Sequence, residues 1–151
     1  MELEELKIYQ LYMKMADDIW YIVYQWNYFE KDTIGKQLVR AADSIAANLS
    51  EGFSRFFYKE EKQFCYYSRN SLSETKTWLT KAFNRKLITQ EQFESFSKEI
   101  KNIGVKLNNF IASIGKKNSS WEKIKLIKKN NFHGADGDNR MSTNDNKVTI
   151  E

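Results

Sequence analysis

Apolar residues recur at intervals of three and four along four long segments of this chain, and that spacing marks one face of an α-helix. The pattern predicts helices over residues 4–29, 34–55, 59–86 and 89–115. Because only short turns separate these segments, we expect an all-α fold, an antiparallel up-down four-helix bundle. The fourth segment has the most regular stripe, which consists of Phe93, Phe96, Ile100, Ile103, Leu107, Phe110 and Ile114.

Local signals predict where the helices begin and end. Thr89 and Gln92 have the spacing of a capping box, which would start the fourth helix. Gly115 is a natural terminator for that helix. Between the first two helices we expect a turn over residues 30–35, with Asp32 or Thr33 capping the helix that follows.

The first helix has more apolar residues than one bundle core requires. Two stripes run along it, one through Tyr9, Met13 and Trp20 and the other through Met15 and Ile19. A face this wide belongs either to a central helix or to a helix that a second subunit covers. A four-helix bundle has no central helix, so the pattern favours self-association.

The composition suits long helices in one soluble domain. The chain has 151 residues, no proline and only six glycines, so little interrupts a helix. Its single cysteine, Cys65, excludes an intrachain disulfide and favours a reducing compartment. The acidic start lacks the layout of a signal peptide, and no apolar run approaches the roughly 20 residues of a membrane span. We therefore expect a cytoplasmic protein without membrane contact.

Positive charge is concentrated behind the predicted bundle. Residues 1–115 carry 16 basic and 15 acidic side chains, whereas residues 116–129 carry six lysines and one glutamate. After residue 130 the sequence has no periodicity, which is typical of disorder. We therefore expect a bundle over 1–115 and a basic, mostly disordered, flexible C-terminal tail over 116–151. The lysines that either contact phosphates or only solubilise the tail are Lys116, Lys117, Lys123, Lys125, Lys128 and Lys129.

The residue types of most catalytic and metal centres are missing. The only histidine, His133, lies in the predicted tail, and Cys65 lies on a helix face. A zinc site or a Ser-His or Cys-His pair is therefore not expected. There is no glycine-rich phosphate loop either. We expect no metal, no cofactor and no enzymatic activity.

Charged and amide side chains occur among the apolar residues of the second and third predicted helices. Arg40 precedes Asp43 by three positions, and Glu51 precedes Arg55 by four, both spacings at which helical side chains meet. We interpret these residues as a structural polar network in which Glu51 and Glu74 accept hydrogen bonds from arginines. The network members are Asn48, Glu51, Arg69 and Glu74, with a carboxylate-using hydrolase as a distant alternative.

The connection between the second and third helices combines rings with cations. Phe53, Phe56, Phe57 and Tyr58 alternate with Arg55 and Lys59. Such a loop can stack unpaired bases. The other interpretation, which we favour, is that the rings close the end of the bundle or are buried against another chain, because exposed rings in a cluster are a liability.

The central motif resembles a known family. Residues 37–55 read QLVRAADSIAANLSEGFSR and residues 66–74 read YYSRNSLSE, and both are similar to the bacterial 23S rRNA intervening-sequence proteins, a family of four-helix bundles. The likeness extends from about residue 6 to 115. Ala46 stands where the family usually has proline, so we expect a straight second helix. The matching residues are Gln37, Arg40, Ala41, Ala42, Ser44, Ile45, Ala47, Asn48, Glu51, Gly52, Arg55, Arg69, Ser71, Leu72 and Glu74.

The resemblance implies a function that the pattern alone does not. It implies a homopentamer, and a similar protein, the accessory protein of diversity-generating retroelements, binds nucleic acid and a reverse transcriptase. We therefore expect a non-enzymatic homo-oligomer that binds RNA or DNA backbone through Arg40, Arg55, Lys59 and the tail lysines. The alternative is a protein-interaction scaffold without nucleic-acid binding, which the nearly neutral bundle favours.

Overall fold

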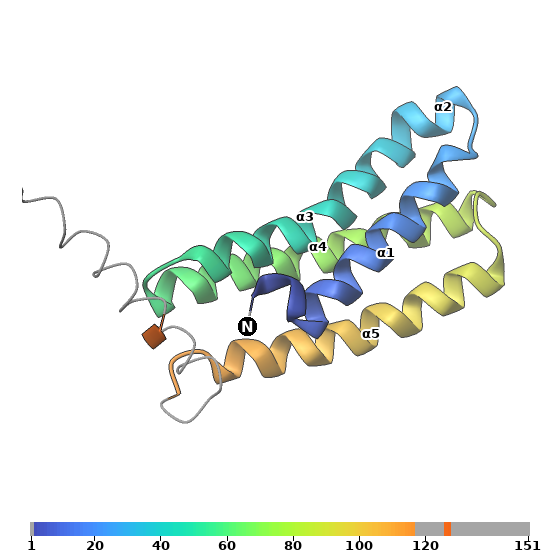
Figure 1. The fold of residues 1–151 in the computed structure, drawn as a ribbon. Helices are drawn as coiled ribbons and strands as arrows, with labels where there is room; N and C mark the ends of the chain where they lie inside the picture. Colours follow the sequence, from blue (N-terminus) through green and yellow to red (C-terminus); the bar gives the residue numbers. More distant parts are fainter. Residues whose placement is uncertain (1, 117–125, 128–151) are drawn as a thin grey trace, which may run out of the picture.

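The computed structural model describes residues 2–116 and 126–127, and within them the chain is all-α, as predicted. Four long helices lie side by side (Figure 1): α1 spans Lys7–Tyr24, α3 spans Lys36–Ser54, α4 spans Tyr58–Asn84 and α5 spans Gln90–Ser113. A 3-10 turn over Leu3–Glu5 precedes α1. No β-strand occurs in the described residues.

Each long helix contacts two others. α3 packs against α1 and α4, and α5 packs against α1 and α4. Tyr9 and Met13, early in α1, lie beside Ala47 and Ser50, late in α3. Trp20, late in α1, lies beside Lys36 at the start of α3. The hairpin of α3 and α4 extends past the beginning of α1 (Figure 1).

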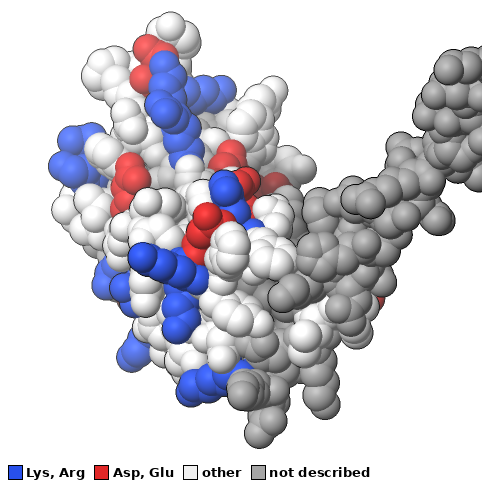
Figure 2. Space-filling model, turned by 90° about the vertical axis from the view of Figure 1, so that its left-hand side faces the viewer, with Lys and Arg blue, Asp and Glu red and all other residues white. Residues whose placement is uncertain are grey.

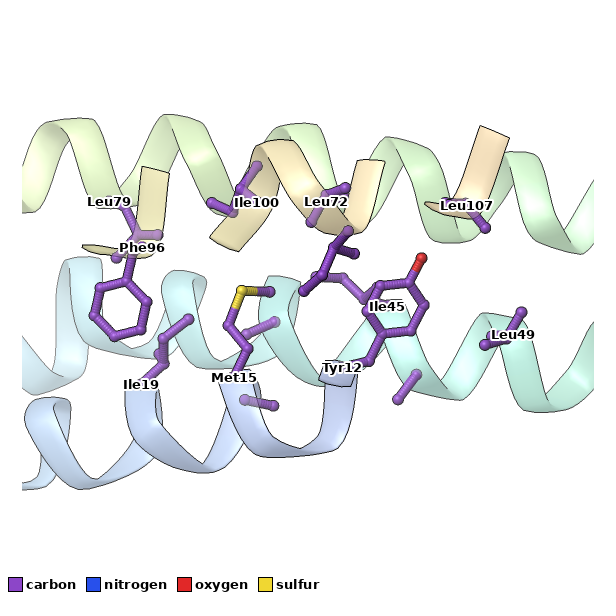
Figure 3. Packing of buried hydrophobic residues seen from close by; sticks show 14 of the residues in the cluster. Tyr12, Met15, Ile19, Ile45, Leu49, Leu72, Leu79, Phe96, Ile100 and Leu107 are labelled. Atoms are coloured by element: carbon purple, nitrogen blue, oxygen red, sulfur yellow. The ribbon is translucent and has the colours of Figure 1, made fainter. Parts of the chain in front are cut away.

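The core runs the length of the contact between all four helices. Figure 3 shows its centre, where side chains from each helix meet. Tyr12, Met15, Ile45 and Leu107 are completely or almost completely buried, as expected from the stripes. Burying a side chain of this size contributes about 1.5–3 kcal/mol, so the shared core is the main source of stability.

The turn predicted over residues 30–35 is wrong. The chain turns earlier, and the Asn27 side chain caps the short helix α2, Tyr28–Glu30, by accepting from the Glu30 backbone N–H at 3.4 Å. The segment Lys31–Gly35 is π-helical and continues into α3. Asp32 caps nothing and instead binds Lys36 at 2.8 Å. An amide side chain at residue 27 therefore outweighed the turn-forming composition that follows it.

The predicted ends of the last helix are confirmed. Thr89 and Gln92 form the capping box, with the Thr89 hydroxyl accepting from the Gln92 backbone N–H at 3.1 Å. Gly115 has φ +85°, the left-handed conformation that ends a helix at lowest cost for glycine. The predicted disorder of the tail falls on residues outside those described. None of the described helices has the length and apolar character needed to cross a membrane.

Candidate functional site

The motif residues of α3 and α4 form a tightly packed contact, which we call the α3–α4 seam, lined by Ile45, Asn48, Gly52, Ser68 and Ser71. The Ser68 hydroxyl donates to the Ile45 carbonyl at 2.7 Å. The Asn48 amide donates to the Ser44 carbonyl at 2.9 Å and reaches the Ser71 hydroxyl at 3.5 Å. At Gly52 an added Cβ would lie 3.0 Å from the Phe64 Cβ. The polar groups of the seam are thus used in holding two helices together.

The predicted polar network exists only in part. Arg55 forms an ion pair with Glu51, one helical turn before it. Arg69 and Glu74, however, do not meet: Arg69 donates to the Asn108 side chain at 3.3 Å, and Glu74 accepts from the Trp78 indole at 3.2 Å. Residues five apart point about 140° away from each other around a helix, so this pairing was geometrically unfavourable.

The predicted pair of Arg40 and Asp43 is also absent. Both side chains are exposed, and no ion pair joins them in the described part of the chain. Asp43 faces Asp17 across the groove between α1 and α3. The Asp43 carboxyl is exposed but still loses part of its water to the neighbouring atoms, and this partial desolvation raises its pKa. The negative charge of Asp17 raises it further.

The predicted phosphate contacts fall into two places. Fifteen positions separate Arg40 from Arg55, which is about 22 Å along the helix axis. Arg55 and Lys59 instead lie at the end of the bundle where α5 finishes. Tyr58, between them in the sequence, packs beside Gly115, since a Cβ added to Gly115 would be 3.8 Å from the Tyr58 ring. Lys116 therefore begins the lysine-rich segment at this end. The predicted phosphate-contacting lysines that lie outside the described residues are Lys117, Lys123, Lys125, Lys128 and Lys129.

The charge at this end is mixed. Figure 2 looks onto it and shows Lys and Arg side chains together with several Asp and Glu side chains. Arg55 is half-buried, pairs with Glu51, and stacks over the Phe64 ring at 4.7 Å. Lys59 is exposed. Phe56 and Phe57 meet edge to face at 5.0 Å and stay largely exposed. Exposed rings and cations thus coincide at the tip of the α3–α4 hairpin.

A second surface was only partly predicted from the sequence. Met13 and Trp20, from the first of the two predicted stripes, are exposed on α1, and so are Tyr21 and Tyr24. The two tyrosines belong to neither stripe. The sequence did contain one indication of this surface: the first helix carries more aromatic residues than its one buried face can accommodate.

The described residues hold no group of three or more His, Cys, Asp or Glu side chains arranged to bind a metal ion. Cys65 is fully buried, and its burial raises the pKa of the thiol to about 12. A thiol with that pKa stays protonated near neutral pH and is a poor nucleophile.

Comparison with known proteins identifies the family and one structural relative. A family model described as 23S rRNA-intervening sequence protein matches residues 4–109. Among solved structures, a protein of unknown function from the S23 ribosomal protein family of Bacteroides thetaiotaomicron is similar, with a TM-score of 0.62 and 22% sequence identity. The match covers 69% of this chain and 97% of that one, and at this identity it shows the fold alone. No curated protein matches this chain.

Proposed function

This chain belongs to the family of 23S rRNA-intervening sequence proteins, and we propose that it is a non-enzymatic, homo-oligomeric helical bundle that binds nucleic-acid backbone as an accessory factor. The proposal includes an antiparallel up-down arrangement of the four long helices. The pairing of early α1 residues with late α3 residues supports that arrangement.

The observation that carries nucleic-acid binding is the meeting of cations at the tip of the α3–α4 hairpin. Arg55 and Lys59 flank this tip, and the lysine-rich segment begins beside it at Lys116. The exposed Phe57 ring lies at the hairpin tip. In the sequence, residues 116–129 carry six lysines and one glutamate. Phosphates attract such a segment without regard to base sequence.

Self-association is supported by the rings that α1 exposes. Trp20 is 52% exposed, Tyr21 67% and Tyr24 62%, although all three are large and mostly apolar. Monomeric proteins rarely leave such residues clustered in water, and aromatic residues are enriched at interfaces between subunits. The homopentamer and the reverse-transcriptase partner implied by the family resemblance are part of this proposal.

Nucleic-acid binding is tested by titrating a fluorescent RNA of mixed sequence at two salt concentrations. We expect affinity to fall steeply with salt, because each neutralised phosphate contributes about 0.9 to the slope on a duplex and 0.7 on a single strand. Replacing Lys59 and Lys116 by Ala should flatten the slope by about 1–2. A matched control, Lys76→Ala with Lys106→Ala, removes the same charge elsewhere. Binding that ignores salt, or no binding, would overturn the proposal.

The second candidate is a scaffold that binds only proteins. Arg55 favours it, because the ion pair with Glu51 and the contact with Phe64 already occupy its guanidinium. In that case the exposed Phe56 and Phe57 would contact a partner protein and the lysines would only solubilise. A protein that assembles normally and takes up no RNA at 50 mM salt would favour this scaffold.

A further inference from the structure

Two grooves lie on either side of α1, and their charges are opposite. The first, which we call the basic groove, is formed with α3 and is lined by Trp20, Tyr24, Lys31, Lys36, Val39 and Arg40. The second, the acidic groove, is formed with α5 and is lined by Lys14, Asp18, Tyr21, Glu91, Phe96 and Glu99. Each groove therefore combines an exposed ring of α1 with charges of one dominant sign.

The basic groove has cations on an apolar floor. The Lys31 ammonium lies 4.8 Å from the centre of the Tyr24 ring. Lys36 binds Asp32 at 2.8 Å, which neutralises one charge. Arg40 is exposed and has no acidic partner in the described residues. A ring with a free guanidinium beside it is a combination common at protein interfaces.

The acidic groove has the complementary character. Lys14 binds Asp18 at 2.5 Å, so these two charges offset each other. Glu91 and Glu99 therefore give the acidic groove its net negative charge. Glu99 is half-buried, and this burial raises the pKa of its carboxyl although Lys14 acts in the opposite direction. Tyr21, at the rim, is 67% exposed.

We infer that the basic groove of one copy of this chain docks against the acidic groove of the next copy. The inference rests on the self-association proposed above and names the surfaces that carry it. Arg40 and Lys36 would face Glu91 and Glu99 of the neighbouring copy, while Trp20 and Tyr21 would be buried together.

Charge decides between this head-to-tail contact and a symmetric one. Two basic grooves facing each other would bring Arg40 and Lys31 close to the same residues of the other copy, and like charges brought together at an interface repel each other. Two acidic grooves facing each other would likewise bring Glu91 and Glu99 of one copy close to the same glutamates of the other. Only the mixed contact pairs opposite signs, and a contact between two different surfaces generates rings or filaments.

The positions of Trp20 and Tyr21 on α1 fit a small closed ring. Consecutive residues of an α-helix point about 100° apart, so Trp20 in one groove and Tyr21 in the other differ by this angle. In a ring, the directions to the two neighbours differ by about 90° for four subunits and about 108° for five, which follows from the rotational symmetry. α1 would then face the inside of the ring.

Such a ring would also collect the proposed nucleic-acid contacts. Both grooves run along the bundle, so neighbouring bundles would stand side by side with the same end up. Every copy of Arg55, Lys59 and Lys116 would lie on one rim. Several weak phosphate sites at fixed spacing bind a long nucleic acid far more tightly than one site does.

The test combines charge reversal with light scattering. The basic-groove variant is Lys36→Glu with Arg40→Glu, and the acidic-groove variant is Glu91→Lys with Glu99→Lys. We expect each to weaken assembly at least tenfold. The four changes together should restore the native mass, because the reversed grooves again have opposite signs. The control, Lys76→Glu with Lys106→Glu, makes the same charge change as the basic-groove variant at exposed positions outside both grooves and should assemble normally.

A second arrangement of the same experiment isolates the head-to-tail geometry. Mixing the two double variants in equal amounts should restore assembly into even-numbered complexes in which the two variants alternate, since each altered groove then meets an altered groove of opposite sign. A closed ring of five cannot alternate, so the mixture should not reproduce the mass of a pentamer. Circular dichroism checks that every variant is folded. Failure of both the fourfold variant and the mixture to assemble, while the native chain is an oligomer, would overturn this inference alone.

Two other outcomes separate the inference from the proposals beneath it. A native chain that is monomeric overturns self-association itself, and with it this interface. A basic-groove variant that keeps its native mass but loses RNA binding, while the control retains it, would show that nucleic acid occupies the basic groove. That result would overturn the docking of a second copy and leave nucleic-acid binding standing.

Discussion

The α3–α4 seam and the outer side of α1 are built from opposite kinds of residue. In the seam, Gly52, Ser68 and Ser71 are small and buried, and they let two helix backbones approach closely. On the outer side of α1, Trp20 and Tyr24 are large and exposed. The seam is complete within one chain, whereas the outer side of α1 leaves large rings exposed, and we propose that a second copy covers them.

This difference separates the residues that determine the fold from those proposed to act. The motif by which the family is recognised, through Asn48, Gly52 and Ser71, lies in the seam and is explained by packing. The grooves beside α1 depend mostly on residues outside that motif, such as Lys31 and Tyr21, although Arg40 of the motif lines the basic groove. The motif in this chain therefore identifies mainly a way of packing helices.

The largest effect is expected for the reactivity of the Cys65 thiol, which measures how often the seam opens. Cys65 is fully buried in α4, and the pKa of its thiol is about 12, so both access and thiolate formation are suppressed. We expect the native protein to react with a thiol reagent at pH 8 at least about 10³-fold more slowly than the urea-unfolded chain, because reaction requires opening of the core. Rapid labelling of the native protein would mean that the seam opens easily.

Truncation of one side chain from each region should give effects of different size. Leu49 is completely buried on α3, so Leu49→Ala should lower the free energy of unfolding by about 2–5 kcal/mol. Trp20→Ala removes a larger side chain but should lower the free energy of unfolding of the isolated chain by less than Leu49→Ala does, by about 1–2 kcal/mol, since only half of Trp20 is buried. Urea unfolding of both variants at a concentration where the chain is monomeric measures this contrast.

The helices and their core followed from the sequence because periodicity depends on local spacing alone. The stripe through Ile103 and Leu107 is buried as expected, and the Thr89 cap occurs where the local pattern placed it. The turn before α3 was missed because the strongest cap, Asn27, precedes the residues that looked like a turn.

The candidate surfaces could not be predicted in the same way. Arg69 and Glu74 share a motif but point apart, and the partner that Arg69 finds, Asn108, lies on another helix. Likewise, the stripes of α1 gave the positions of its apolar residues without indicating whether α3, α5 or another chain covers them. Contacts between helices depend on rotation and register, which one-dimensional spacing does not contain.

Two glycines distinguish the close approach in the seam from an ordinary helix contact. A Cβ at Gly52 would lie 3.0 Å from the Phe64 Cβ and 3.1 Å from the Glu61 carbonyl oxygen. Gly52→Ala should therefore force α3 and α4 apart and cost about 1–3 kcal/mol. At Gly104 the nearest atom is a Leu72 methyl at 3.7 Å, so Gly104→Ala should add up to about 1 kcal/mol through helix propensity. Equal effects in thermal unfolding would contradict the difference.

The smallest effect is expected at Asp43, which lies with Asp17 in a second hollow between α1 and α3, separate from the basic groove. Partial desolvation and the nearby Asp17 raise the pKa of Asp43 above the value of 3.8 that we take for the unfolded chain. A carboxyl with a raised pKa binds its proton more tightly in the folded state, so stability falls as pH rises above about 4. Asp43→Asn removes this penalty and should stabilise the chain at pH 7 by no more than about 0.5 kcal/mol.

The pH dependence and a neighbouring carboxylate make this small effect interpretable. The gain from Asp43→Asn should disappear below pH 3.8, where Asp43 is protonated in both states. Asp18→Asn serves as the control and should give no gain at pH 7, because Asp18 is already compensated by Lys14 at 2.5 Å. If Asp43→Asn instead lowered the free energy of unfolding at pH 7, the carboxylate would have a favourable partner. The hollow that holds Asp17 and Asp43 would then be optimised for the single chain, as the seam is.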